Sequence, residues 1–314
     1  MRRHHAFRDL APTDRGAAVA IGNFDGVHLG HQSVLALARA AAAEHGAAFG
    51  VITFEPHPRA FFNPAAPCFR LMSAEARARR LEKLGVEQLY ELPFDARLAA
   101  LTPQDFAAEV LRDGLGICHL VAGEDFRFGH DRSGDVETLR RLGARMGFAV
   151  TPAPLVSHQA GDDLSSTAIR AALADGRPEV AARMLGHWHR IEGRVLHGDA
   201  RGRELGFPTL NLALDGLHLP RFGVYAVLVD VLDGPHRGRH PGAASIGERP
   251  TFGRNVPNLE VHLLDFSGDL YGAEVSVALV AFQRPELAFT DVAALVRQMD
   301  NDVTETRARL AGVI

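Results

Sequence analysis

The chain is poor in cysteine and has no long apolar run. Its two cysteines in 314 residues, Cys68 and Cys118, are too few for a disulfide framework or a CxxC metal site, and their scarcity suits a reducing compartment. No stretch approaches the roughly 18 apolar residues that a membrane helix needs, and the N-terminal segment lacks the apolar core of a signal peptide. We therefore expect a cytoplasmic protein without a membrane partner.

The chain also lacks a strong excess of one charge, and it has almost no lysine. A net charge of −4 offers no wide basic surface, so we expect no nucleic-acid partner. Lys83 is the only lysine, so a mechanism that requires a catalytic lysine has one candidate. No GxGxxG follows a predicted strand, which disfavours a dinucleotide-dependent oxidoreductase, and the chain has no GxxxxGK[ST] loop.

What is present suits two globular domains. The length, with 46% hydrophobic and 23% charged residues, is typical of such a chain. In the first half, short apolar runs alternate with amphipathic helical stretches, which predicts βαβ units around a parallel sheet. The predicted strands are 17–22, 49–54, 86–92, 117–123 and 148–153, and the predicted helices lie near 31–45, 73–84, 103–113, 133–146 and 165–175.

The hydrophobic pattern changes near residue 186. Beyond it, segments alternate with period two between glycine and proline turns, which predicts a compact antiparallel β-domain in the form of a small barrel. A last helical stretch over 289–311 opens with Thr290 as its expected N-cap. The sequence thus predicts an α/β chain with a parallel-sheet domain over 1–185 and a β-barrel domain with a C-terminal helix over 186–314.

A ten-residue run, GNFDGVHLGH, follows the first predicted strand and begins at Gly22. It enters a helix near Gly30, whose missing side chain would let a substrate approach the backbone closely. His28 and His31 share a face at the helix start, beside unpaired backbone N–H groups that suit a phosphate. The HxxH spacing alone is weak evidence, because 16 histidines produce about one such pair by chance. The alternative is a structural turn with surface histidines.

Two further segments place polar residues beyond predicted strands. GEDFRFG brings Asp125 and Arg127 to the carboxyl edge of the sheet, where ligands bind in such folds. TFEPHP adds a carboxylate and His57 beyond the second strand. Either segment alone is equally explained as an ordinary loop.

LSSTAIR, at 164–170, places hydroxyl groups at the start of a predicted helix. Hydroxyls and N–H groups there could hold the β- and γ-phosphates of ATP, and an arginine one turn later could neutralise them. Plain N-capping is the alternative. The residues concerned are Ser165, Ser166, Thr167 and Arg170.

A glycine-rich loop in the β-domain leads into the tetrad PTLN. Thr209 and Asn211 are two apart, so on an extended segment they share one face, and their oxygens suit Mg²⁺. Backbone N–H groups of the loop could wrap phosphates, with nearby arginines meeting the charge. The loop residues concerned are Gly198, Gly202, Gly206, Arg201 and Arg203.

A carboxylate on a later predicted strand could act as a base. Glu260 lies on the segment NLEVHLLDF with His262 on its own face. It could accept the proton of an attacking hydroxyl. A solvent-facing strand residue is the alternative.

Together these segments resemble two enzyme families. FDGVHLGH, TFEPHP, GEDFRFG and SSTAIR resemble the HxGH nucleotidyltransferases and, in combination, the FMN adenylyltransferase module of bacterial FAD synthetases. GRELGFPTLNL, FGVYAV, SIGERPTF, LEVHLLDFSGDLYG and FQRPELAF resemble riboflavin kinase over almost the whole β-domain. The joint resemblance, over about 17–310, is to the bifunctional bacterial riboflavin kinase/FAD synthetases.

The resemblance implies a Rossmann-like nucleotidyltransferase domain and a β-barrel riboflavin kinase domain, both using ATP. Riboflavin would become FMN in the second domain, and FMN would become FAD with release of pyrophosphate in the first. It implies catalytic roles for His28, His31, Arg170 and Glu260, and Mg²⁺ held by Thr209 and Asn211. The implied nucleotide- and flavin-binding residues are Gly22, Phe24, Asp25, Gly30, Asp125, Ser165, Ser166, Thr167, Gly198, Gly206, Asn211 and Arg284.

Some positions depart from the family pattern. Leu210 stands in place of the usual alanine, Ser245 in place of a frequent asparagine, and Gln283 and Pro285 differ from the commoner form. None removes an implied catalytic group. We expect the Leu210 side chain to point away from its polar neighbours, which would change packing and leave the kinase active.

Three rival functions remain to be separated. Other HxGH transferases would leave the β-domain unexplained, and a class I aminoacyl-tRNA synthetase needs a lysine-rich motif that a chain with only Lys83 lacks. Outside enzymes, the chain could be a flavin-binding regulatory protein with weak or single activity. The sequence leaves assembly into a homo-oligomer open.

Overall fold

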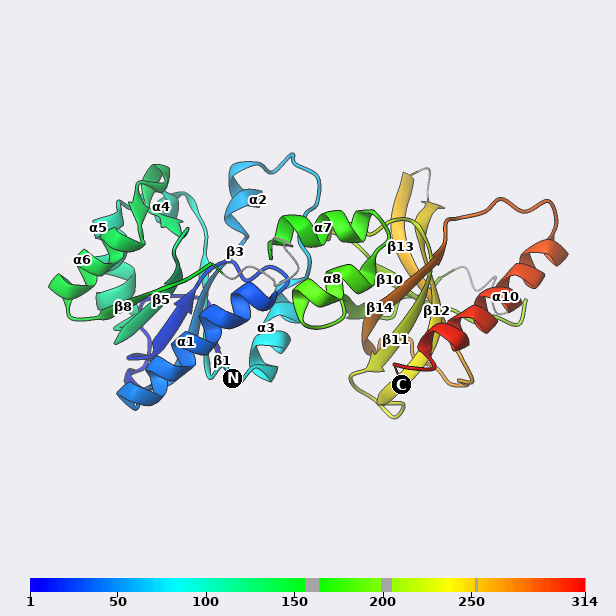
Figure 1. Cartoon of the computed structure of the whole chain (residues 1–314), viewed down its shortest axis with the longest axis horizontal. Coiled ribbons are helices and arrows are strands. Elements are labelled where there is room, and N and C mark those ends of the chain that lie inside the picture. The colour runs from blue at the N-terminus through cyan, green and yellow to red at the C-terminus, as the bar shows by residue number, and fades with distance from the viewer. Residues whose placement is uncertain (156–163, 199–204, 252–253, 314) are drawn as a thin grey trace. The chain divides into compact units, whose positions relative to one another are not determined.

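The computed structural model describes residues 1–155, 164–198, 205–251 and 254–313. The chain forms two compact units, the first made of Met1–Ala66 with Ala74–Leu164 and the second of Pro67–Ser73 with Ser165–Ile314. The predicted fold class is confirmed: a parallel-sheet unit is followed by an antiparallel near-barrel with a C-terminal helix (Figure 1). The domain boundary between residues 185 and 186 stays a prediction.

The first unit is built on a parallel sheet with the strand order β1-β4-β3-β2-β5-β8. The strands are β1 Arg2–His4, β2 Ala18–Ile21, β3 Phe49–Glu55, β4 Gln88–Pro93, β5 His119–Gly123 and β8 Ala149–Ala153, with a small hairpin of β6 Arg127–Phe128 and β7 Gly134–Asp135. The helices are α1 Leu29–His45, α2 Pro58–Phe62, α3 Ala74–Lys83, α4 Ala96–Ala100, α5 Pro103–Asp105 and α6 Val136–Met146; Phe106–Leu115 form a π-helix, and Pro12–Asp14 and His130–Arg132 form short 3₁₀ turns.

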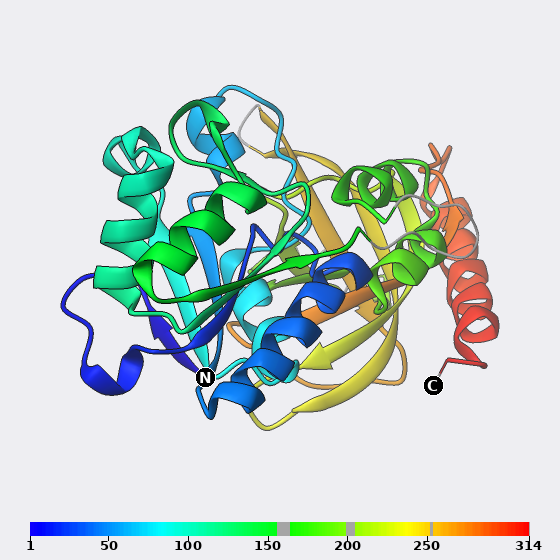
Figure 2. The ribbon, with the colours of Figure 1, turned by 60° about the vertical axis from the view of Figure 1, so that its left-hand side comes forward.

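Central strands of this sheet are buried on both faces, as parallel strands covered by helices should be. Helix α1 packs on β2, β3 and β5, and it begins at its N-cap His28 and ends at the left-handed Gly46. The π-helix and α6 supply Val110, Leu111 and Leu139 to the core on the other face (Figures 1 and 2). Helices on both faces leave the carboxyl ends of the strands for a site.

All five predicted strands of this unit are present, and each predicted helix has a helical counterpart. Strand β1 and the short helices α2 and α4 were not predicted. Each of these elements is five residues or shorter, so hydrophobic periodicity has too few residues to reveal it.

The second unit is an antiparallel sheet with the order β10-β13-β12-β11-β14-β9. Its strands are β9 Arg190–Arg194, β10 Leu210–Ala213, β11 Gly223–Val231, β12 Gly238–Thr251, β13 Arg254–Leu263 and β14 Glu274–Arg284, and its helices are α7 Ser166–Ala174, α8 Pro178–Leu185 and α10 Val292–Leu310. Beyond β9, Leu196 pairs with Asn211 of β10 in an antiparallel bridge, which brings the two edge strands together and nearly closes a barrel.

The inner face of this sheet holds the core of the second unit. Leu210, Leu212, Leu259 and Val261 belong to this core, so the neighbouring side chains on these strands face outward. The prediction that Leu210 points away from Asn211 is therefore confirmed.

Helix α10 lies on the outside of β11, β12 and β14 (Figure 2, red). Its N-cap is Asp291, whose carboxylate accepts the backbone N–H of Ala294 at 2.7 Å. The prediction of Thr290 as the N-cap was therefore wrong. Aspartate is the stronger cap of two adjacent candidates, and the helix begins after it.

Candidate active sites

The turn between β2 and α1 adopts a backbone that is rare for its residues. Phe24 and Val27 have φ values of 51° and 45°, in the left-handed region that a β-branched valine seldom occupies. Both side chains are buried, and the N–H of Val27 donates to the carbonyl of Phe24 at 3.2 Å. Asp25 is also buried, at 4% exposure. The turn is thus held in a strained shape by its own packing.

His28 and His31 lie together at the start of α1, as the sequence predicted. Their rings stack with centroids 3.6 Å apart, and Nδ1 of His28 accepts the backbone N–H of His31 at 3.3 Å. Because Nδ1 carries a lone pair, the neutral His28 ring has its proton on Nε2 and can donate from there.

His31 is set up as a neutral ring. Burial, together with the neighbouring His28, holds the pKa of His31 well below its usual value. Its Nδ1 is buried and has no hydrogen-bond partner among the described residues.

Gly30 lies tightly against a side chain of the turn, whereas Gly22 has ordinary clearance. A Cβ on Gly30 would lie 3.2 Å from Cε1 and Nδ1 of His28, and a Cβ on Gly22 would meet the Phe24 ring at 3.4 Å. The sequence interpretation of Gly30 as a point of close substrate approach stays a prediction. The structure adds that glycine leaves room for the His28 ring.

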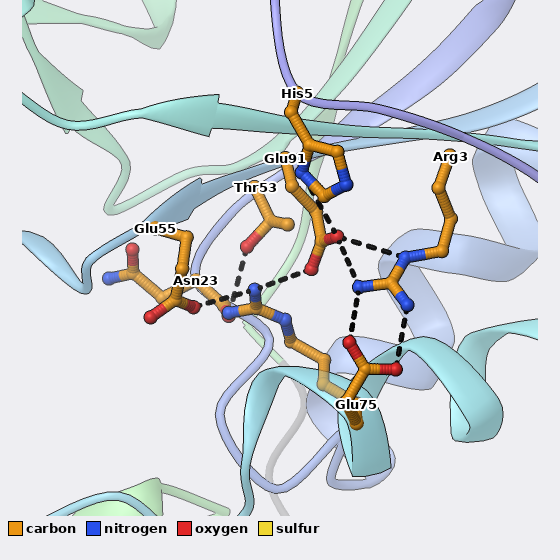
Figure 3. Close-up of polar contacts among 8 residues, drawn as sticks. Arg3, His5, Asn23, Thr53, Glu55, Glu75 and Glu91 are labelled. Atoms are coloured by element: carbon orange, nitrogen blue, oxygen red, sulfur yellow. Dashed lines mark hydrogen bonds and ion pairs between the residues drawn. The ribbon is translucent and has the colours of Figure 1, made fainter.

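A buried ionic network, which was not predicted from the sequence, lies under this turn (Figure 3). Arg77 of α3 has no exposed surface and pairs with Glu55 at 3.1 Å and with Glu91 at 3.2 Å. It also donates to the backbone carbonyl of Asn23 at 3.3 Å. Arg3 of β1 contacts Glu91 at 2.7 Å from the other side. The sequence holds one indication of this network, because Arg77 lies on a helix face that is otherwise apolar.

Other predicted residues of the first unit lie at the carboxyl ends of its strands. Asp125 is exposed just after β5, and Arg127 lies on β6, 3.9 Å from Asp135 of β7. His57 follows β3 as the N-cap of α2, where its Nδ1 accepts the backbone N–H of Arg59 at 3.0 Å. Both segments therefore occupy the predicted edge of the sheet.

The SSTAIR segment forms the start of α7 and belongs to the second compact unit. Ser165 is the N-cap, and its Oγ accepts the N–H of Ala168 at 3.2 Å, so N-capping is confirmed for this residue. Nε of Arg170 donates to the carbonyl of Phe69 at 2.5 Å, and its guanidinium lies over the Phe69 ring. Ser166 and Thr167 follow in the first turn of the helix.

A pocket on the outer face of the near-barrel brings together predicted kinase residues. Thr209, Glu260 and Arg284 line it, although they come from separate segments of the chain. Helix α10 contributes the apolar residues Leu295 and Met299 to its wall. The lining therefore combines polar and apolar side chains, as a site for an amphipathic small molecule should.

Asn211 lies beside Glu260 through strand register. Asn211 of β10 pairs with Glu260 of β13, which in turn pairs with Ser245 of β12, so the three side chains form one row across the sheet. Asn211 is 7% exposed, and its Oδ1 lies 3.4 Å from Nδ2 of Asn258. A Cβ on Gly198 would clash with the Asn211 amide, so glycine is needed there.

Arg284 is already engaged by the protein. Its Nε and Nη2 donate to both carboxylate oxygens of Asp302 on α10, at 2.8 and 2.7 Å. Its Nη1 donates to the carbonyl of Pro285 at 3.0 Å. Arg284 thus fastens α10 to β14 beside the pocket that it lines.

The loop before β10 is described only in part. Gly206 is exposed and has a φ of 87°, which glycine adopts without strain. Gly202, Arg201 and Arg203 lie outside the described residues.

The first unit has a parallel sheet whose first crossover helix starts with paired histidines, and the second has a near-barrel with a carboxylate in its pocket. Fold and sites together define a two-domain transferase, with a nucleotidyltransferase-like unit and a small-molecule kinase-like unit.

Comparison with known proteins agrees with this class. The family model for FAD synthetase matches residues 10–168, and that for riboflavin kinase matches 185–310. The bifunctional riboflavin kinase/FMN adenylyltransferase of Pseudomonas fluorescens is 43% identical over 312 residues, covering 99% of this chain and 98% of that one. The Escherichia coli K12 protein of the same name is 40% identical over 292 residues, covering 93% and 92%. The chain belongs to the family of bifunctional riboflavin kinases/FMN adenylyltransferases.

A crystal structure named as a macrolide-efflux protein from Streptococcus pneumoniae has the same fold. It is 34% identical, with a TM-score of 0.83 over 98% of both chains. Among the described residues of the present chain, no helix is long and apolar enough to cross a membrane.

The family membership establishes the reactions. The protein is a transferase that phosphorylates riboflavin with ATP to FMN and adenylylates FMN with ATP to FAD. Riboflavin, FMN, FAD and ATP are therefore its substrates and products.

Proposed function

We propose that the two reactions use separate sets of side chains, one carried mainly by each compact unit. The observation that supports this most strongly is the pocket of the second unit, where Thr209, Glu260 and Arg284 meet from separate segments. His28 and His31 belong to the first unit.

In the kinase reaction, Glu260 is the general base. Its carboxylate accepts the proton of the ribityl 5′-hydroxyl while that oxygen attacks the γ-phosphorus of ATP, and the bond to ADP breaks. The outward position of Glu260, between core residues Leu259 and Val261, supports this role because it directs the carboxylate into the pocket.

Thr209 and Asn211 would hold Mg²⁺ with the nucleotide. A hydroxyl and an amide oxygen are hard donors of the kind that Mg²⁺ takes, and the near-complete burial of Asn211 fixes its amide. Bound there, Mg²⁺ would neutralise charge on the transferring phosphates. Gly198 and Gly206 would bring backbone N–H groups to the same phosphates. Arg284 would line the part of the pocket that binds the flavin.

In the adenylyl transfer, a phosphate oxygen of FMN attacks the α-phosphorus of ATP and pyrophosphate leaves. The attacking phosphate is already ionised, so stabilisation of charge matters more here than a base. Nε2–H of His28 and the ring of His31 would donate to the α-phosphate. The remaining proposed contacts to ATP or FMN are Gly22, Phe24, Asp25, Gly30, Asp125, Ser165, Ser166, Thr167 and Arg170.

Four further features complete the proposal: domain bounds, location, absence of a nucleic-acid partner and self-association. The adenylyltransferase domain spans 1–185 and the kinase domain 186–314. The protein works in the cytoplasm, where the free thiols of Cys68 and Cys118 stay reduced, and it takes no nucleic-acid partner. Self-association into a homo-oligomer is checked by light scattering at assay concentration.

Glu260→Gln and His28→Ala test the separation of the two sites. With riboflavin, ATP and Mg²⁺, Glu260→Gln should lower FMN formation by about 10²–10⁴-fold, since a general base contributes that much. Supplied FMN should still become FAD at the wild-type rate. His28→Ala should show the reverse pattern, with FMN accumulating and little FAD.

Chromatography of the flavins gives the rate of FMN formation from riboflavin and, in a second reaction started with FMN, the rate of FAD formation. Loss of both activities in a folded Glu260→Gln protein would refute the separation of sites. If His28→Ala made FAD at the wild-type rate, the assignment of ATP to the turn at 22–31 would be wrong.

A further inference from the structure

The strained turn that carries His28 is anchored at one carbonyl group. The carbonyl of Asn23 accepts from Nη1 of Arg77 and from Oγ1 of Thr53, each at 3.3 Å (Figure 3). One residue earlier, the N–H of Gly22 donates to the carbonyl of Ile52 at 3.1 Å. Helix α3 and strand β3 thus hold the first peptide groups of the turn.

The Arg77 guanidinium is itself held on its other side. Its Nη2 contacts Glu55 at 3.1 Å and Glu91 at 3.2 Å, and Glu91 is buried with it. Arg3 donates to the second oxygen of Glu91 from Nε and Nη2, at 3.1 and 2.7 Å. Arg3 also forms a two-bond pair with Glu75, which neutralises this outer arginine. Glu55 and Glu91 therefore hold the planar fork of Arg77 with Nη1 directed at the turn.

A fully buried arginine is an expensive way to stabilise a fold, since well-packed apolar residues often serve equally well. Here the guanidinium of Arg77 orients a backbone group, the carbonyl of Asn23. Rotation of the Asn23 carbonyl would turn the Asn23–Phe24 peptide plane and thereby the left-handed Phe24 that follows it. Phe24 in turn lies 5.2 Å from the His31 ring, centroid to centroid.

We propose that Arg77 is a positioning residue for adenylyl transfer. It acts through the Asn23 carbonyl to hold the turn, and with it His28 and His31, in the geometry that receives the α-phosphate. The proposal rests on the assignment of ATP to this turn. Arg77 itself needs no contact with substrate.

Two arginine-to-lysine changes separate positioning from plain stability. Arg77→Lys and Arg3→Lys both replace a fork that contacts Glu91, but only Arg77 contacts Asn23. We expect Arg77→Lys to lower kcat for FAD formation by about tenfold or more, because small misplacements of reacting groups cost that much. KM for FMN and ATP should change less than about threefold, since groups that bind in the ground state are retained.

Hydrogen exchange gives a readout that does not depend on activity. Amides of residues 22–32 should exchange faster in Arg77→Lys than in the parent, and Arg3→Lys should leave both this exchange and kcat close to the parent values. The riboflavin kinase activity of the same chains should be unchanged. Thr53→Val removes the other donor to Asn23 without touching the ion pairs, and it should act in the same direction as Arg77→Lys, with a smaller effect.

Several outcomes would overturn the proposal. One is an equal fall of kcat in Arg77→Lys and Arg3→Lys in proportion to lost thermal stability; another is unchanged kcat and exchange in both Arg77→Lys and Thr53→Val. His28→Ala, measured beside them, separates the two ideas. If His28→Ala abolishes FAD formation while Arg77→Lys is fully active, the positioning role alone is wrong. If His28→Ala is fully active, the assignment of ATP to the turn is wrong as well.

Discussion

Two residues near the proposed ATP site are in conformations or environments that are unfavourable for their residue type. Arg77 carries a charge with no exposed surface, and Val27 holds a left-handed φ of 45°. A strained backbone residue of this kind costs about 1–3 kcal/mol and persists only where packing enforces it. Both residues belong to the turn or support it, so the strain and the buried charge lie next to the proposed ATP site.

Gly198 gives a prediction at the scale of one residue. An added Cβ would lie 2.8 Å from Cγ of Asn211, which is closer than side chains tolerate. We expect Gly198→Ala to displace the Asn211 amide and to lower kcat of riboflavin phosphorylation by about tenfold or more. The rate of FMN formation measures it.

Gly193→Ala is the matched control on β9. Its Cβ would meet only Cδ2 of Leu212 at 3.8 Å, an ordinary contact. Kinase activity should therefore stay near the parent value, and both variants should convert FMN to FAD normally. Equal kinase rates in the two variants would show that the position of Asn211 does not matter.

Among the elements, α10 has the clearest functional consequence, because it forms a wall of the kinase pocket. Leu295, Met299 and Val303 are four residues apart, so they lie on the helix face that lines this pocket. The helix is fastened by Arg284 to Asp302 and by a 2.6 Å hydrogen bond from Gln283 to Thr306. These polar contacts to β14 thus help to fix its placement, beside the packing of Leu310 in an apolar cluster with Leu228.

Asp302→Asn should loosen this wall. Removing the charge of Asp302, which leaves a largely buried guanidinium less well hydrogen-bonded, should lower the free energy of unfolding by about 1–3 kcal/mol. We expect KM for riboflavin to rise several-fold, because Met299 and Val303 flank Asp302 on the helix, with adenylyl transfer to FMN unaffected. Steady-state kinetics and denaturant titration measure the two effects.

Glu305→Gln tests the specificity of that result. It breaks the exposed pair with Arg309 on the same helix, at 2.7 Å, and exposed pairs of this spacing contribute less than about 0.5 kcal/mol. Riboflavin KM should not change. If Glu305→Gln and Asp302→Asn had the same effect on KM, the anchoring contact to Arg284 would not be the cause.

For the whole molecule, each compact unit has a hydrophobic core and proposed catalytic residues of its own. The core of the first unit lies between the parallel sheet and its helices, and that of the second lies inside the near-barrel. The only tryptophan, Trp188, packs in the second unit beside Leu228 and Leu310. Its fluorescence therefore reports unfolding of that unit.

The stability of the second unit should depend on pH through His189. Burial, with a smaller effect of His187 and His218, lowers the pKa of His189 to about 3. The unfolded chain binds a proton near pH 6.5, and the folded chain does so only near pH 3. Stability is therefore complete above pH 6.5 and is lost as the pH falls, by about 1.4 kcal/mol per pH unit.

Denaturant titration followed by Trp188 fluorescence at pH 6.5 and pH 5 measures this loss. We expect about 2 kcal/mol from His189 over this interval, as the difference between the parent and His189→Leu. The variant should be less sensitive to acid, whatever its absolute stability. The same pH slope in both proteins would show that His189 titrates normally in the folded state.

Much of the fold follows from local pattern. Five strands of the first unit were predicted because they are apolar runs between helical stretches, and the near-barrel was predicted because its segments alternate with period two. Thr290 failed as a cap because two adjacent capping residues cannot be ranked by pattern alone. Strand β1 was missed because three residues carry no periodicity.

The sites divide in the same way. His28 and His31 were predicted to lie together because helical spacing places them so. The row of Asn211, Glu260 and Ser245 depends on the register of three strands. A local sequence pattern cannot predict that register, because it depends on pairing between distant segments.

The sequence by itself predicted a parallel-sheet half and an antiparallel half, because hydrophobic periodicity is a local property, and its motifs carried the family resemblance from which the chemistry and the proposed side chains follow. Only the tertiary structure decided that Arg77 lies beneath the first turn and that Arg284 is held by α10. The physical reason is that a buried charge is stable only where distant segments bring its partners. Glu55, Glu91 and the Asn23 carbonyl come from three such segments, which the folded sheet places around one guanidinium.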